Sequence, residues 1–183
     1  MGQRERLTVQ QENPNSPAPA SEQRPLLEVV DLKTYFRTDE GLARAVDGVS
    51  FSLHAGRTLA VVGESGCGKT VTALSILRLL SMPPGEFAGG KIVFDGRNLI
   101  DLPSRELHAI RGGDIAMIFQ EPGTSLNPVF TIGDQITEAI LLHRKMSKAE
   151  ARSEVLRVLR EVRMSEHERR LNQYPHELSG GMK

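Results

Sequence analysis

The sequence predicts an α/β fold that carries an antiparallel β subdomain and an inserted helical subdomain. Three observations lead to this prediction. An apolar run at residues 59–62 continues through a glycine-rich turn into an amphipathic helix. Apolar runs between residues 27 and 100 are separated by turn residues, as in antiparallel strands. From Thr131 onward, apolar residues recur at helical spacing and no strand pattern remains.

The predicted chain organisation has three parts. Residues 1–25 are rich in Gln, Asn, Ser, Pro and Glu and hold almost no large apolar side chains, which predicts a disordered tail. Residues 26–130 form the predicted N-terminal part of an α/β core. Residues 131–183 form the predicted helical subdomain.

Composition excludes several classes of protein. Hydrophobic residues make up 39% and charged residues 25% of the 183 residues, which is typical of a soluble globular protein. The net charge of zero argues against a nucleic-acid-binding surface, so we expect no nucleic acid partner. The single cysteine, Cys67, excludes an internal disulfide framework and a cysteine zinc cluster.

Membrane insertion is also not expected. The polar, charged start of the chain does not resemble a signal peptide. No apolar stretch approaches the roughly 20 residues that a membrane-spanning helix needs. We therefore expect a cytoplasmic protein that reaches a membrane only through a partner.

Two strands are predicted before the glycine-rich turn. The first begins at Leu27 and runs toward Tyr35 and Phe36. The second occupies residues 43–53, where one set of apolar residues shares a face if Gly48 forms a bulge.

After the glycine-rich region, Asp95-Gly96 between apolar runs predicts a hairpin with a type I′ turn. Residues 103–110 are predicted to form a short helix. The fully apolar stretch 115–119 is predicted to be a buried strand that ends at Gln120.

The segment at residues 63–70 carries the strongest motif. It reads G-E-S-G-C-G-K-T and fits G-x-x-x-x-G-K-[ST], the phosphate-binding P-loop. The predicted helix behind it has one apolar stripe and stops at Pro83-Pro84-Gly85; the stripe consists of Ala73, Ile76, Leu77 and Leu80.

The chemistry of a triphosphate explains these residue types. Backbone N–H groups can surround phosphate oxygens only where no side chain intervenes, so the loop is rich in glycine. The first N–H groups of the helix also have no partners within the helix, so they can bind an anion. Lys69 is expected to reach the β- and γ-phosphates, and the Thr70 hydroxyl is expected to bind Mg²⁺. The expected nucleotide-binding residues are Gly63, Glu64, Ser65, Gly66, Cys67, Gly68, Lys69 and Thr70.

The helical subdomain has two apolar stripes and two predicted helix starts. Ser147 with Glu150, and Ser165 with Glu168, fit the capping-box pattern. The apolar stripes are Ile132, Ile136 and Ile140, and Val155, Leu159 and Val162. The chain closes on Leu178-Ser179-Gly180-Gly181, whose glycines offer accessible backbone N–H groups and make this a second candidate for anion binding.

Together these pieces resemble the ATP-binding subunit of an ABC transporter, and more closely its oligopeptide and dipeptide importer subfamily. Residues 63–70 resemble the Walker A motif, and residues 178–182 resemble the signature motif L-S-G-G-Q. Four further stretches are similar to the importers; they read LKTYFRTDEG at 32–41, AVDGVSFSL at 45–53, QEPGTSLNPV at 120–129 and YPHELSGGM at 174–182.

The resemblance implies a transport-coupled ATPase, in which ATP binding and hydrolysis drive the import of peptides or similar solutes, and it implies roles for individual residues. Phe36, with Tyr35 as the alternative, would stack on adenine, and Gln120 would act as the Q-loop residue that helps to hold Mg²⁺. Ser179 to Gly181 would contact ATP on a second, head-to-tail ATP-binding subunit. Transmembrane permease subunits would be the other partners, with the protein peripheral on the cytoplasmic face of the membrane.

The sequence departs from the family pattern at its end. The family continues past the signature with an apolar strand followed by Asp and Glu, the Walker B motif, and these residues are not in this chain. We therefore expect the 183-residue chain alone to bind nucleotide weakly, if at all, and not to hydrolyse it. The alternative function is a non-hydrolysing nucleotide-binding module or an inactive remnant. A P-loop kinase that uses Asp95 is a more distant alternative.

Overall fold

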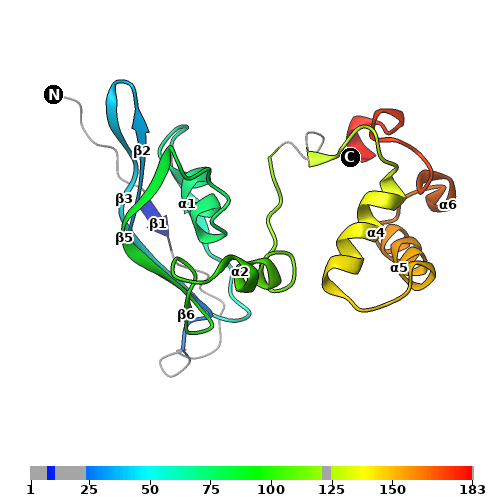
Figure 1. The fold of residues 1–183 in the computed structure, drawn as a ribbon, viewed down its shortest axis with the longest axis horizontal. Helices are drawn as coiled ribbons and strands as arrows, with labels where there is room; N and C mark the ends of the chain where they lie inside the picture. The colour runs from blue at the N-terminus through cyan, green and yellow to red at the C-terminus, as the bar shows by residue number, and fades with distance from the viewer. Residues whose placement is uncertain (1–7, 11–23, 121–124, 183) are drawn as a thin grey trace. The chain divides into compact units, whose positions relative to one another are not determined.

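A computed structural model of the chain describes residues 8–10, 24–120 and 125–182. The chain divides into two compact units, Met1–His108 and Ala109–Lys183 (Figure 1). The predicted domain boundary at residues 130 and 131 falls inside the second unit and stays a prediction.

A four-stranded antiparallel sheet dominates the first unit, in the order β3-β2-β5-β6. Its strands are β2 (Leu27–Thr38), β3 (Gly41–Leu53), β5 (Gly85–Phe94) and β6 (Arg97–Asn98). Strands β5 and β6 are joined by Asp95 and Gly96, which both have positive φ, 44° and 78°. Those angles are the mark of a type I′ turn, so the predicted hairpin is confirmed.

The predicted bulge at Gly48 is also present. Pairing between β2 and β3 passes from Leu32–Val49 to Lys33–Asp47, so Gly48 has no partner in the register. Its φ of 87° lies in the left-handed region that glycine enters without strain. The bulge lets Val46 turn into the core, where it is almost fully buried.

Helix α1 (Lys69–Ile76) packs against strand β2 through a buried polar contact. Thr34 of β2 and Ser75 of α1 are both completely buried, and their hydroxyl oxygens lie 3.0 Å apart. The Ser75 hydroxyl also donates to the Val71 carbonyl, so it keeps its hydrogen bonds although it is buried. Of the predicted apolar stripe, Leu77 is buried and the other three residues are half-buried, whereas two small hydroxyl residues, Thr72 and Ser75, take the most buried positions of the helix.

Gly68 caps the start of α1 and lies directly against strand β3. Its φ is 95°, and a Cβ atom at this position would come within 2.3 Å of the Ala45 carbonyl oxygen. A side chain cannot be accommodated there unless the backbone moves. Gly66 also has a positive φ, 84°, but the space around its Cα is open. The two loop glycines therefore have different reasons to be glycine.

Strand β4 (Ala60–Val62) leads into the glycine-rich loop and pairs antiparallel with β1 (Thr8–Gln10). Within the described residues β4 has no other partner strand. Thr8–Gln10 belong to the predicted disordered tail, so the structure departs from that prediction at these three residues. Most of the rest of the predicted tail, residues 1–7 and 11–23, lies outside the described residues.

The predicted buried strand at residues 115–119 is wrong. Only Ile115 makes a strand-like bridge, to Arg111, and Ile118 is 93% exposed. A fully apolar strand is stable when neighbours cover both of its faces and both of its edges. The described part of the chain supplies no such neighbours for Ile118 and Phe119. The predicted short helix at residues 103–110 is confirmed as α2 (Ser104–Ile110).

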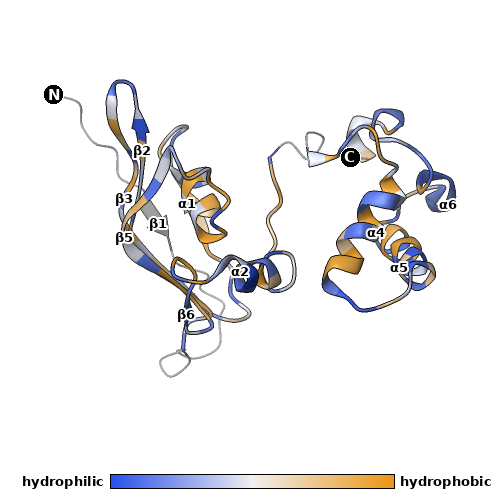
Figure 2. Cartoon of the chain, in the orientation of Figure 1, coloured by the Kyte–Doolittle hydropathy of each residue, from blue (hydrophilic) through white to orange (hydrophobic). Residues whose placement is uncertain are grey.

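The second unit is helical, as predicted, with α4 (Ile132–His143), α5 (Lys148–Glu161) and α6 (His167–Arg170). Figure 2 shows apolar residues of α4 and α5 on the faces where these helices meet. Val155, Leu159 and Leu171 form the buried cluster, with Ile136 and Ile140 packed against it. The predicted stripe of Val155, Leu159 and Val162 is wrong at Val162, which is 64% exposed because α5 ends at the preceding residue.

One of the two predicted capping boxes exists. The Ser147 hydroxyl accepts from the Glu150 N–H, and the Glu150 carboxylate accepts from the Ser147 N–H at 2.7 Å. The predicted box at Ser165 and Glu168 is wrong, because α6 starts at His167 with Glu166 at its N-terminal cap in a left-handed conformation.

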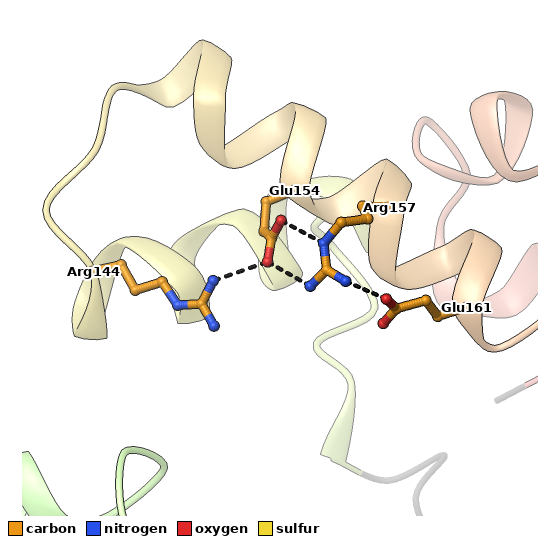
Figure 3. Close-up of polar contacts among 4 residues, drawn as sticks. All are labelled: Arg144, Glu154, Arg157 and Glu161. Atoms are coloured by element: carbon orange, nitrogen blue, oxygen red, sulfur yellow. Dashed lines mark hydrogen bonds and ion pairs between the residues drawn. The ribbon is translucent and has the colours of Figure 1, made fainter.

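An ion network ties the end of α4 to α5 (Figure 3). Glu154 accepts from Arg157 at 2.7 Å and from Arg144, just past α4, at 2.8 Å, and Arg157 also bonds Glu161. Hydrogen bonds from these guanidinium groups, most strongly that from Arg157, lower the pKa of Glu154 to about 2. The same contacts raise the pKa of Arg157. The Glu154 side chain is only 18% exposed, so its charge depends on these partners.

The first prediction concerns Gly68. Replacing Gly68 by Ala adds a methyl group against the Ala45 carbonyl, on top of the cost of a positive φ. Gly66→Ala, the matched control, carries only the conformational cost. We expect Gly68→Ala to lower the free energy of unfolding by roughly 1–3 kcal/mol more than Gly66→Ala, measured by urea denaturation. Equal losses in the two variants would contradict the packing argument.

The second prediction concerns pH. The folded-state pKa of Glu154, about 2, lies below the ordinary glutamate value of about 4.3. Its contribution to stability is therefore fully present above about pH 4.3 and is lost as the pH falls toward about 2. We expect Glu154→Gln to lower the urea midpoint at pH 6, and the difference from the parent chain to shrink steadily over that window. Glu138→Gln is the control, since Glu138 makes no ion pair within the described residues. A difference that persists unchanged at pH 2 would refute this role of the carboxylate.

Candidate functional site

The strongest candidate site is the loop that joins β4 to α1. Lys69, the first residue of α1, turns its side chain back over the loop. Its ammonium group donates to the carbonyl oxygens of Gly63 at 2.7 Å and Glu64 at 2.6 Å, and lies 3.5 Å from the Cys67 sulfur. The loop therefore closes around a positive charge that its own carbonyl groups orient.

Backbone N–H groups of the same loop are available to a ligand. Among the described residues, no hydrogen bond uses the N–H groups of Gly66, Gly68, Lys69 or Thr70. Cys67 has only a long bond, 3.4 Å, to the Glu64 carbonyl. Free N–H groups at a helix start, next to an oriented ammonium group, form a site for an anion. These residues fit the phosphates of a nucleotide.

The exposure of the individual loop residues agrees with an anion-binding site. Gly63 to Gly66 are exposed, Cys67 and Lys69 are half-buried, and Gly68 is buried. The exposed half can be reached by a ligand, whereas Gly68 holds the helix start against β3. Sequence reasoning identified the loop residues but missed Ala45, whose carbonyl oxygen decides that position 68 must be glycine. No sequence signal marks Ala45, because the contact is made by its backbone.

The described residues supply only part of the ligand set for a metal ion. Thr70 is exposed at the start of α1, where its hydroxyl can serve as one ligand. The described part of the chain contains no group of three or more His, Cys, Asp or Glu side chains arranged to hold a metal. Such a donor set fits Mg²⁺ only as an ion carried largely by phosphate oxygens, with Thr70 as a protein ligand.

The two aromatic candidates for adenine differ in their surroundings. Tyr35 donates to the Asp47 carboxylate at 2.6 Å, and the Arg44 guanidinium lies over its ring, 5.5 Å from the centroid. The bond to Asp47 raises the pKa of Tyr35. The half-buried Phe36 pairs with Gly85 of β5 and with Ala43 of β3, so its neighbours across the sheet are small. Phe36 therefore remains the better candidate, since the Tyr35 ring is already engaged.

Gln120, Leu178, Ser179, Gly180 and Gly181 all belong to the second unit, whereas the P-loop belongs to the first. Gln120 is exposed and follows the exposed Phe119. Residues 121–124 of the predicted importer-like stretch lie outside the described residues.

The segment after α6 presents its glycines outward. Leu178 is buried and donates its N–H to the Pro175 carbonyl, which anchors the segment. Ser179, Gly180 and Gly181 are exposed, and a Cβ atom on either glycine would meet nothing within 4 Å. Neither glycine has a positive φ. Within the described residues, neither crowding nor backbone conformation requires glycine at these two positions, and their backbone is open to close approach by another molecule.

No helix in the described part of the chain combines the length and the apolar character needed to cross a bilayer.

Known proteins are similar to this chain over a range that includes the loop at residues 63–70. The ABC transporter family model matches residues 46–183. A probable peptide ABC transporter ATP-binding protein of Sinorhizobium fredii is 54% identical over 86% of this chain and 47% of its own length. The oligopeptide transport ATP-binding protein OppD of Bacillus subtilis is 49% identical over 86% of this chain and 44% of its own. The chain thus spans about half the length of these relatives.

Solved structures support the same assignment. The dimeric structure of MJ0796, a bacterial ABC transporter cassette, is similar with a TM-score of 0.71 and 25% identity, over 85% of this chain and 64% of the other. The predicted resemblance to the ABC family and its peptide-transport members is confirmed by the sequence relatives, and the predicted fold class by the structural one. The chain belongs to the ABC transporter family of ATP-binding proteins.

Proposed function

We propose that this chain supplies the nucleotide-binding part of an ATP-binding subunit in an importer for peptides or similar solutes. The single observation that carries the proposal is the loop at residues 63–70. There, Lys69 is held by two backbone carbonyls beside N–H groups that have no partner within the described residues. Peptide transport enters from the names of the relatives in Sinorhizobium fredii and Bacillus subtilis.

The loop residues would divide the work of holding ATP. The N–H groups of Gly66, Gly68 and Lys69 would bind phosphate oxygens, and the Lys69 ammonium would exchange its carbonyl partners for the β- and γ-phosphates. Thr70 would hold Mg²⁺ together with Gln120. Phe36 would stack on adenine, where a flat apolar ring binds the base without reading its edges.

The second unit would act on a neighbouring subunit. Ser179 to Gly181 are exposed, with open space where side chains would be, and can approach phosphates bound to another copy or a homologous subunit. A solved relative in this family is a dimer by its own description. We propose the same head-to-tail arrangement here, with transmembrane permease subunits as further partners and a peripheral place on the cytoplasmic side of the membrane.

Hydrolysis needs groups beyond those in the loop. An attacking water must be oriented at the γ-phosphate, and an acidic side chain must complete the Mg²⁺ site. Among the residues that the structure describes, no carboxylate follows a buried apolar strand in the way that the family's Walker B acids do. Asp95, the nearest resemblance, sits in the type I′ turn instead. We propose that the chain by itself binds nucleotide weakly and does not turn it over, and this observation equally favours a non-hydrolysing module as the second candidate function.

The third prediction tests this proposal. We expect ATP to bind the purified chain weakly, and Lys69→Ala to weaken binding further by roughly tenfold to a hundredfold, because a charge-assisted hydrogen bond is lost. Calorimetric titration with Mg·ATP measures this. Lys33→Ala is the matched control, because Lys33 pairs with Asp31 on the sheet and not with the loop.

Two outcomes would contradict the proposal. Equal ATP affinity in the parent chain and in Lys69→Ala would remove the loop from nucleotide binding. Release of inorganic phosphate from ATP by the parent chain, absent in Lys69→Ala, would show that the chain hydrolyses ATP alone.

A further inference from the structure

The Phe36 ring lies against Gly85 on the neighbouring strand of the sheet. The two residues are direct partners in the register of β2 and β5, which run side by side in Figure 1. A Cβ atom added to Gly85 would come within 3.3 Å of the Phe36 Cε1 atom and 3.6 Å of Cδ1. The ring therefore occupies the space that a side chain at position 85 would take.

Packing favours glycine at position 85, whereas backbone conformation does not. Gly85 is buried, and its φ does not lie in the left-handed region. Besides the Phe36 ring, the nearest atom to the added Cβ is the Ser81 carbonyl oxygen at 3.0 Å, which already accepts the Gly85 N–H. A side chain here would press on the ring and on this carbonyl.

Hydrogen bonds around the pair hold Phe36 beside Gly85. The Arg37 N–H donates to the Pro84 carbonyl at 3.0 Å, one residue beyond the pair. The Arg37 guanidinium donates through Nε and Nη2 to one Glu86 carboxylate oxygen, at 3.0 and 2.8 Å. Because the two strands are joined in this way, a methyl group on Gly85 would displace the ring more easily than the backbone.

Phe36 lies on the face of the sheet against which the start of α1 packs. Side chains alternate along a strand, so Phe36 shares a face of β2 with Thr34, whose hydroxyl contacts Ser75 of α1. The register of β2 with β5 is unbroken between these two positions. The start of α1 packs on β3 through Gly68 and Ala45. The ring is therefore on the side of the sheet where the base of a nucleotide held by the loop would lie.

We propose that Gly85 is a positioning residue for nucleotide binding. Its missing side chain lets the Phe36 ring settle against β5, in the orientation in which the ring stacks on adenine. Gly85 acts on the base only through the ring. This role rests on the proposed function, in which Phe36 stacks on adenine, and it adds a residue that lies outside the P-loop motif.

The test compares Mg·ATP with Mg·tripolyphosphate, which keeps the phosphates and lacks the base, in calorimetric titrations of the purified chain. Gly85→Ala displaces the ring, so we expect ATP affinity to fall roughly threefold to tenfold, a part of what stacking on an aromatic side chain contributes. Tripolyphosphate affinity should not change, whereas a general loss of structure would weaken both ligands.

Gly89→Ala is the matched control. It also adds a methyl group to β5 without a positive φ, and this group would meet only the Lys33 side chain, at an ordinary 3.5 Å. We expect it to bind both ligands like the parent chain.

A double variant tests whether the ring carries the effect. In a chain with Phe36→Ala, we expect Gly85→Ala to lower ATP affinity no further, because the two changes act on one interaction. Three results would each overturn the role of Gly85. These are an unchanged ATP affinity in Gly85→Ala, an equal fall for both ligands, and an undiminished effect in the Phe36→Ala chain.

Circular dichroism shows whether Gly85→Ala folds. If it does not, Gly85→Ala/Phe36→Ala is the deciding variant. Recovery of the fold supports the contact with the ring, whereas no recovery assigns the glycine to the Ser81 carbonyl and overturns the proposal. Failure of the proposed function has a different signature, namely equal tripolyphosphate affinity in the parent chain and in Lys69→Ala.

Discussion

The close approach of the Gly68 backbone to the Ala45 carbonyl is the constraint on which the candidate site depends. It places the first turn of α1 directly on β3, and no side chain fits at that point. From there, α1 is held to the sheet by the buried hydroxyl pair of Thr34 and Ser75. The start of the helix, with its free N–H groups, is therefore fixed by packing rather than by any ligand.

A loop fixed in this way is organised for an anion before an anion arrives. Lys69 already lies over the loop, bonded to the Gly63 and Glu64 carbonyls, so binding would exchange partners without moving the side chain from a distant position. Polar groups that are oriented in advance cost less to use than flexible ones. The arrangement agrees with the family assignment and gives it a physical reason in this chain.

The glycines of the two units illustrate two different constraints. Gly68 is glycine because its own chain crowds it and because its φ is positive. Gly180 and Gly181 are neither crowded nor in the left-handed region, so their own unit does not explain them. A backbone without side chains is open to close approach by another molecule, which is the reason that a second subunit enters the proposed function.

The sequence by itself determined the elements whose cause is local. The P-loop spacing, the type I′ turn at Asp95-Gly96, the bulge at Gly48 and the Ser147 cap depend on neighbouring residues, and each was predictable from them. The site residues 63–70 follow from the same local chemistry.

The tertiary structure alone decided the features that depend on distant partners. Position 68 must be glycine because of a backbone carbonyl on another strand, and α1 buries Thr72 and Ser75 because β2 offers a hydroxyl partner. Ile118 reads as a buried strand residue, yet is exposed, because burial requires neighbours that a local pattern cannot supply. Periodicity describes one segment at a time, whereas packing depends on which segments meet.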